Sequence, residues 1–308
     1  MIKINDNKGI ALMMTLWALV LLSVLAMSFV FSVRFGNAST RNFKEDTEAY
    51  YLALSAYEEA VAYILSDKDP TIDYIDENGA FRTDSERQPV SGKKTVGSNI
   101  VDIRITDEES RLNINTISTE RFKSLFKYAK VSDDDVLTMI DSLADWRDPD
   151  KLARPLGAEA DYYKDYGYDA KNNRVEVVEE LLVIRGFKPE HLYGTEKNPA
   201  VYPLLTVWGD GLNINTVSEE LLRAMEFSEI EIDKVLSQRS NHGPMKSMPL
   251  GISGFSNFAS RHIRIDTRAW NEKSPLAVKI TAIIDRSDNP EHVMKVLYWK
   301  EEIENSGA

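Results

Sequence analysis

The hydrophobic residues of this chain are concentrated in one uninterrupted block near the N-terminus. Residues 10–33 contain no charged side chain and no Asn, Gln or His, and their only hydroxyl side chains are Thr15, Ser23, Ser28 and Ser32. As a helix the block would be about 36 Å long, enough to cross a hydrocarbon core of about 30 Å. A cleaved secretory signal has a shorter apolar region, of about 7 to 15 residues. The pattern predicts a membrane-spanning helix that stays on the chain, and a plain signal anchor is the simplest interpretation.

The helical pattern continues beyond the apolar block. Apolar residues recur every three or four positions over residues 50–64, and acidic residues occupy the other faces. No Pro or Gly occurs between residues 37 and 66. The sequence therefore predicts one helix over about residues 10–65, roughly 80 Å long and amphipathic only in its second half. The alternative is a membrane helix hinged at Gly36 to a separate globular helix.

Period-two alternation predicts an antiparallel sheet from segments at both ends of the remaining chain. Strands are expected at residues 99–106 and 262–267, and two further β-rich runs follow at 277–284 and 293–299. Residues 67–94 are rich in Asp, Pro, Gly and Ser and predict a loop region.

A five-residue repeat divides the middle of the chain. Leu-Asn-Ile-Asn-Thr occurs at residues 112–116 and again at 212–216. Ser118 and Ser218 follow the two copies and are good N-caps for the helices expected over residues 120–129 and 219–225. Each copy thus predicts a short extended segment followed by a capped helix.

Composition narrows the function classes. A length of 308 residues predicts about two domains, and the formal net charge of -12 argues against a surface that follows nucleic-acid phosphates. Without cysteine there are no disulfides or thiol nucleophiles, and four histidines leave few routes to a zinc centre. The sequence shows no nucleophile with a nearby base, no phosphate loop and no metal-histidine motif, so it does not predict an enzyme.

The repeat raises one competing function. Asn-Ile-Asn-Thr before a short helix also opens helix-hairpin-helix DNA-binding modules, which hold phosphate with a Gly-apolar-Gly hairpin. The corresponding hairpins here, residues 130–135 and 227–231, lack those glycines and carry carboxylates. A third short helix, expected over residues 179–184, leads to Gly186, but no second glycine follows. The sequence favours packing units over phosphate binding.

An acidic stretch lies between the repeats. Five carboxylates fall within 17 residues, and Pro149 and Gly157 can bend the chain around a centre. These candidate ligands are Asp145, Asp148, Asp150, Glu159 and Asp161. Calcium takes six to eight oxygen ligands and tolerates irregular geometry, so this set suits calcium better than magnesium. The EF-hand spacing is absent, and a solvated acidic face is the alternative.

The residues just before the apolar block resemble a known processing signal. Lys8-Gly9 precedes it, and cleavage between Gly9 and Ile10 would leave the hydrophobic helix on the mature chain. This resembles the class III leader of type IV pilins and type II secretion pseudopilins. In that family the fifth mature residue is normally a glutamate that pairs with the N-terminal amine of a neighbour, whereas here it is Met14. An unpaired charge inside an apolar fibre costs several kcal/mol. The resemblance therefore implies a subunit at one end of the fibre.

Motifs in the middle of the chain resemble one family of pseudopilins. Asp-Trp-Arg-Asp at residues 145–148, Gly-Ala-Glu at 157–159 and the doubled Leu-Asn-Ile-Asn-Thr together resemble the protein K family of minor pseudopilins in type II secretion. The resemblance implies an α+β fold: a pilin-like long N-terminal helix plus antiparallel sheet, with a large inserted mostly helical domain. The expected parts are a leader (1–9), a transmembrane segment (10–33), the helix stem and first strands (34–111), the insertion (112–227) and the C-terminal sheet (228–308).

The same resemblance implies the function. A prepilin peptidase would process the chain, which would then be methylated and take a place at the tip of the pseudopilus, supporting protein export across the outer membrane. It would lie in the inner membrane as a single-pass protein with its bulk in the periplasm. Expected partners are other minor pseudopilins through the N-terminal helix, with the outer-membrane secretin or secreted cargo as further candidates, and no nucleic acid. Calcium, if bound, would be structural. The alternatives are a membrane-anchored helix-hairpin-helix DNA-binding protein and a membrane-tethered hydrolase.

Overall fold

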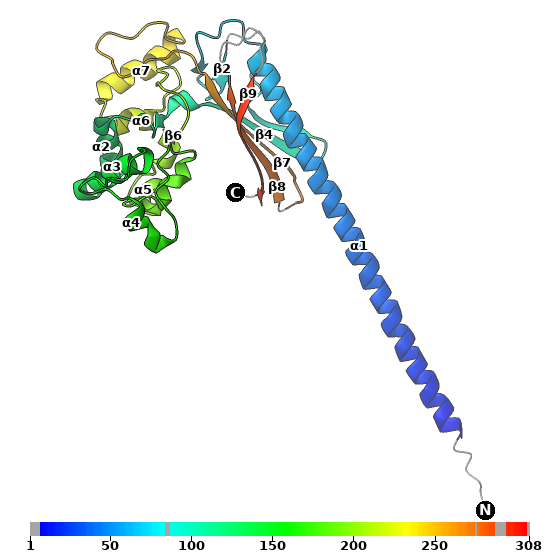
Figure 1. Ribbon diagram of the computed structural model, residues 1–308. Coiled ribbons are helices and arrows are strands. Elements are labelled where there is room, and N and C mark those ends of the chain that lie inside the picture. The colour runs from blue at the N-terminus through cyan, green and yellow to red at the C-terminus, as the bar shows by residue number, and fades with distance from the viewer. Residues whose placement is uncertain (1–6, 84–86, 275, 287–293, 307–308) are drawn as a thin grey trace, which may run out of the picture.

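One long helix forms the stem of the molecule. The computed structural model describes residues 7–83, 87–274, 276–286 and 294–306. Its helix α1 (Asn7–Leu65) runs from the N-terminal end to the sheet without a break (Figure 1). Gly36 lies inside this helix, so the single continuous helix is formed and the hinge at Gly36 is not.

A five-stranded antiparallel sheet packs against the second half of α1. Its strand order is β3-β4-β7-β8-β9, and β4 pairs with β7 from Asn99 opposite Asn271 to Asp107 opposite Ile263. The strands are β3 (Gly92–Val96), β4 (Asn99–Asp107), β7 (His262–Asn271), β8 (Leu276–Asp285) and β9 (Lys295–Asn305). The α+β fold with a long N-terminal helix and an antiparallel sheet is thereby confirmed. A small hairpin, β1 (Tyr74–Ile75) and β2 (Phe81–Arg82), lies within the expected loop region.

Small side chains let α1 approach the sheet closely. Ala49, Ala53, Ala56 and Ala60 recur at helical spacing and are almost fully buried. Thr267 on β7 donates a buried hydrogen bond from Oγ1 to the carbonyl oxygen of Ala53, at 2.9 Å. The contact between helix and sheet is therefore made partly by backbone, which fixes how α1 lies across the strands.

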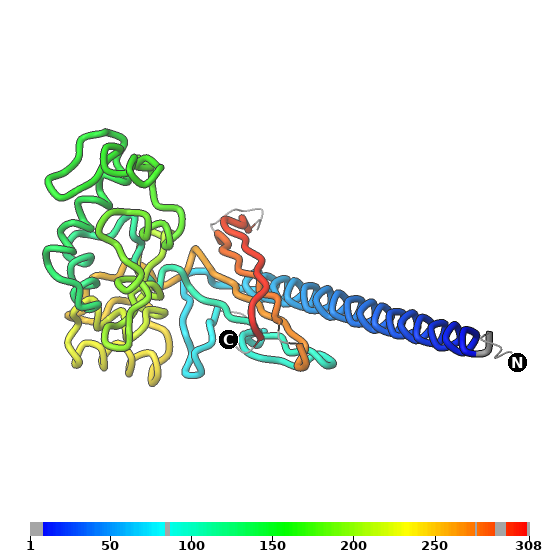
Figure 2. The backbone as a smooth tube through the Cα atoms, turned by 90° about the horizontal axis from the view of Figure 1, so that it is seen from below, coloured from blue at the N-terminus to red at the C-terminus, as the bar shows by residue number. Residues whose placement is uncertain are grey.

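A mostly helical domain is inserted between β4 and β7. Figures 1 and 2 show it beside the sheet, at the end of the molecule opposite the N-terminus. Its elements in chain order are η1 (Glu108–Ser110), β5 (Leu112–Asn113), α2 (Thr119–Tyr128), α3 (Asp133–Arg147), α4 (Ala160–Tyr163), η2 (Lys164–Tyr166), η3 (Val178–Val183), α5 (Pro189–Tyr193), η4 (Tyr202–Leu204), β6 (Leu205–Thr206), α6 (Glu219–Ala224) and α7 (Glu229–His242). The third expected helix is the 3₁₀ segment η3, not an α-helix.

The helical domain extends past its expected end at residue 227. Helix α7 belongs to it and begins at a capping box formed by Ser228 and Glu231. Ile232, Val235 and Met245 are buried in the same apolar cluster as the rest of the domain. The expected C-terminal segment 228–308 is therefore not all sheet, because burial of these apolar side chains binds α7 and the loop after it to the insertion.

The two repeats make the same local bonds. Asn115 donates from Nδ2 to the carbonyl oxygen of Val175 at 2.9 Å and accepts from the amide of Val175 at 2.9 Å. Asn215 makes the equivalent pair with Met245, at 2.9 and 2.8 Å. Each repeat therefore uses its second asparagine to hold a chain segment that arrives from 30 or 60 residues further along.

A buried polar cluster joins the sheet to the insertion. Asp107 ends β4 and accepts hydrogen bonds from Asn213 Nδ2 (3.1 Å) and Thr216 Oγ1 (2.6 Å) of the second repeat. Two residues on, Glu109 accepts from the ring and backbone of His262, where β7 begins. Burial, followed by the charge of Glu109, raises the pKa of Asp107 well above its ordinary value. The two strand ends that carry the insertion are thus tied to its core.

Candidate functional sites

The first half of α1 is apolar and stands clear of the rest of the protein. Over its most apolar 18-residue window the mean hydropathy is 2.5 and no residue is buried inside the protein. Gly9 and Ile10, the expected processing residues, lie in the first turns of the helix. Met14 is 63% exposed on the same segment. An apolar helix with no cover of its own is what a membrane anchor requires, by length and composition. Residues 1–6 of the expected leader lie outside the described residues.

The acidic stretch folds around the C-terminal end of α3. Asp145 lies in its last turn with no exposed surface, and Asp148 forms its C-cap. One carboxylate oxygen from each of Asp148, Asp150 and Glu159 lies within 4.8 Å of the others. Arg154 reaches Asp145 at 3.3 Å and Asp148 at 3.2 Å, so this cation pairs with two of the carboxylates. The structure therefore brings four of the five expected ligands together.

Several of these oxygens are buried without a hydrogen bond. They are Asp148 Oδ1 and both carboxylate oxygens of Glu159; Asp145 Oδ1 also lacks a hydrogen bond but lies 3.3 Å from Arg154 Nε. Burial raises the pKa of Glu159, and the charges of Asp145, Asp148 and Asp150 raise it further. Burial also raises the pKa of Asp145. Unpaired buried carboxylate oxygens are costly, and a hard divalent cation is the group that would satisfy them. These residues fit calcium.

Three further residues show which side chains belong to the carboxylate cluster. Asp161 is not part of it, because its side chain is fully exposed and pairs with Lys164 at 2.9 Å. Gly157 is required by close approach, since a Cβ atom there would come within 1.9 Å of Asp145 Oδ2. Asn172 was not expected: its Nδ2 donates to the carbonyl oxygen of Asp150 at 3.0 Å, and its Oδ1 is buried without a partner. The sequence carried no signal for Asn172 beyond its place in a polar loop.

The turn that leads into the second hairpin contacts helix α2 of the first repeat. Lys130 and Glu226 occupy the left-handed turn positions, with φ of 57° and 63°. Glu226 accepts hydrogen bonds from Lys127 at 2.6 Å and Ser124 at 3.2 Å, both on α2. Glu226 is therefore a carboxylate already paired with the helix of the first repeat. A negative charge at this position does not favour phosphate binding.

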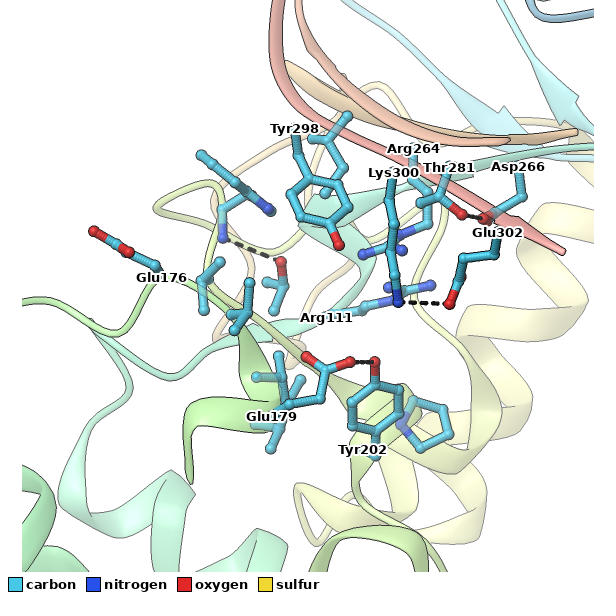
Figure 3. A pocket seen from close by; sticks show the side chains of 18 of the residues that line it. Arg111, Glu176, Glu179, Tyr202, Arg264, Asp266, Thr281, Tyr298, Lys300 and Glu302 are labelled. Carbon is cyan, nitrogen blue, oxygen red and sulfur yellow. Dashed lines mark hydrogen bonds and ion pairs between the residues drawn. The ribbon is translucent and has the colours of Figure 1, made fainter. Parts of the chain in front are cut away.

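A cleft of about 310 Å³ separates the insertion from the face of the sheet opposite α1 (Figure 3). Tyr202 donates to Glu179 at 2.6 Å, and burial with this carboxylate raises the pKa of Tyr202. Lys300 pairs with Glu302 at 2.7 Å, and both lie on β9. Arg264 pairs with buried Glu108 at 2.6 Å. These charged groups of the cleft are therefore paired with one another.

Comparison with known proteins gives one family match. Residues 99–203 match the family model described as type II secretion system (T2SS), protein K. Over these residues, about a third of the chain, the sequence is similar to protein K of type II secretion. Comparison with the curated proteins finds no match.

A solved structure has the same fold as this chain. It is the crystal structure of the GspK-GspI-GspJ complex from the type 2 secretion system of enterotoxigenic Escherichia coli. The identity is 17%, the match covers 85% of this chain and 99% of that chain, and the TM-score is 0.62. Protein K is a minor pseudopilin of type II secretion and a structural component, and the apolar N-terminal helix is consistent with a membrane anchor.

Proposed function

We propose that this chain forms the tip of a type II secretion pseudopilus and takes part in protein export across the outer membrane. A prepilin peptidase cuts it after Gly9, residues 10–33 anchor it in the inner membrane, and the remainder lies in the periplasm. The observation that carries the proposal is the arrangement of α1, whose first half is apolar and uncovered while its other end bears the sheet and the insertion (Figure 1).

Two features support the tip over the shaft. Met14 replaces the carboxylate that would neutralise the amine of the next subunit, so no subunit can stack beyond this one in the usual way. The insertion, which ends just before β7, adds a bulk that close-packed shaft subunits would have to exclude. The related GspK is found in a complex with GspI and GspJ, and we propose the corresponding minor pseudopilins as partners here.

The processing step is tested by co-expressing the full-length protein with a prepilin peptidase and measuring intact mass and N-terminal sequence. We expect a mature chain that begins at Ile10, and a Gly9→Val control that remains uncut. A chain that still carries residues 1–9, under conditions that process a control pseudopilin, would refute the proposal.

We also propose that calcium binds at Asp148, Asp150 and Glu159, with Asp145 behind them. When bound, calcium neutralises the carboxylates and supplies no acid-base chemistry. The residues themselves hold the end of α3 against the start of α4, since Asp148 caps the first helix and Glu159 precedes the second. The proposed role is to fix the shape of this loop on the surface of the tip domain.

A further inference from the structure

A groove of about 470 Å³ lies between the stem helix α1 and the edge strand β9. Its apolar lining includes Phe43 and Tyr51 from α1 and Ile303 from β9. These three side chains are 74%, 60% and 67% exposed. The groove lies beyond the membrane segment, where α1 first meets the sheet (Figure 1). Exposed apolar side chains that gather in one hollow mark an interaction surface.

The α1 side of the groove has the shape of a helix-packing ridge. Every fourth residue along it alternates between large and small: Phe35, Ser39, Phe43, Thr47 and Tyr51. Rows at this spacing form the ridges that fit between the side chains of another helix. The surface therefore suits a helix lying along α1.

The charged residues that line the groove are all acidic. Asp46, Glu301 and Glu302 are carboxylates, and among the described residues that line the groove no Lys, Arg or His joins them. Glu302 is paired with Lys300, but in the part of the chain that the structure describes no ion pair forms at Asp46 or Glu301. Glu301 instead accepts hydrogen bonds from Tyr50 (3.2 Å) and Trp299 (2.9 Å), which hold its carboxylate in place. An occupant of this groove is favoured if it brings a cation.

We propose that this groove receives a helix of a neighbouring pseudopilin that carries a lysine or arginine beside apolar residues. The aliphatic part of the basic side chain lies on Phe43 and Tyr51, and its charged end meets Asp46 and Glu301. The inference rests on the proposed function, because it requires α1 to stand among other subunits of a fibre. It adds the position and the chemistry of the contact.

Photo-crosslinking in the full-length protein, co-expressed with the other minor pseudopilins in membranes, tests the proposal. A benzophenone residue replaces Tyr51 in one variant and Leu19, inside the membrane segment, in another. We expect the groove position to capture a helical peptide that contains Lys or Arg. Asp46→Lys combined with Glu301→Lys should lower the yield about tenfold. Glu58→Lys, an exposed position of α1 outside the groove, should leave the yield unchanged.

The outcomes separate this inference from the proposed function. Crosslinking from residue 19 without crosslinking from residue 51 would refute the groove and leave the fibre assembly standing, whereas failure at both positions would refute both. Capture of a peptide without a basic residue, or equal losses with Glu58→Lys, would also overturn the inference. Glu301→Gln keeps the oxygen that accepts from Tyr50 and Trp299, so a reduced yield with this variant identifies charge, not packing, as the cause.

Discussion

Replacing Glu159 by Gln should raise the stability of the metal-free protein and lower the stability of the calcium-bound protein. In the metal-free protein the pKa of Glu159 lies above its ordinary value of 4.5, so its charged form is disfavoured. The metal-free protein therefore loses stability as the pH rises from about 4.5 through the raised pKa. Glu159→Gln lacks that loss and should be more stable than the wild type at pH 7 without calcium. With calcium it should be less stable.

The size of the calcium effect follows from mass action. At a calcium concentration of 100 times Kd, binding to the native state adds about 2.7 kcal/mol to the free energy of unfolding. For a domain of this size that raises Tm by about 5 to 10 °C. Removing one of three carboxylates whose oxygens lie within 4.8 Å of each other weakens binding. A 100-fold weakening leaves only about 0.4 kcal/mol at the same calcium concentration.

Differential scanning calorimetry of both proteins, with calcium and with chelator, measures these four values of Tm. Asp161→Asn serves as the matched control, because Asp161 lies outside the cluster and should leave the calcium response unchanged. The reasoning is refuted if Glu159→Gln gains as much Tm from calcium as the wild type. It is equally refuted if the variant is the less stable protein in chelator at pH 7.

Three further changes test other parts of the structure. Gly157→Ala should cost about 2 to 4 kcal/mol, measured by urea unfolding, because the new Cβ displaces Asp145 from its buried position. Asn215→Ala should cost about as much, since it leaves both backbone groups of Met245 buried and unpaired; an unchanged midpoint would contradict this. Burial raises the pKa of Asp73 to about 6, so its ionisation lowers stability as the pH rises from about 4 through 6. Asp73→Asn should show a smaller fall in urea midpoint between pH 4 and pH 7, and an undiminished fall would count against it.

The elements that were predictable from sequence are those with one dominant pattern. The long helix follows from an apolar block and an unbroken helical period, and β4, β7 and β8 follow from alternation or apolar runs. Strand β3 was not expected, because its Gly-Lys-Lys-Thr-Val sequence is mostly exposed and pairs only through its backbone. Helix α7 was missed for a different reason. Its capping box at Ser228 is local, but its membership in the insertion depends on contacts distant in sequence.

The candidate metal site was likewise only partly predictable from the sequence, because it depends on contacts between distant segments. Spacing alone grouped Asp161 with four other carboxylates, because all five lie in one acidic stretch: Asp145, Asp148, Asp150, Glu159 and Asp161. Only the fold shows that Asp161 points to solvent from α4 while Glu159 turns inward. Asn172 enters through a loop that returns to Asp150 after 22 residues, and such a return leaves no pattern in the local sequence. The groove beside β9 likewise unites residues 43–51 with residues 301–303, which no local pattern relates.

The insertion separates two neighbouring strands of the sheet by a long stretch of chain. Strands β4 and β7 are neighbours, yet Asp107 and His262 are 155 positions apart. Closing a flexible loop of that length costs about 4 to 5 kcal/mol in chain entropy. The bonds of Asp107 with Asn213 and of Glu109 with His262 bring the two ends together once the insertion has formed. We therefore expect the helical domain to fold early and to template the sheet, so that the surface of the insertion matures before the stem is complete.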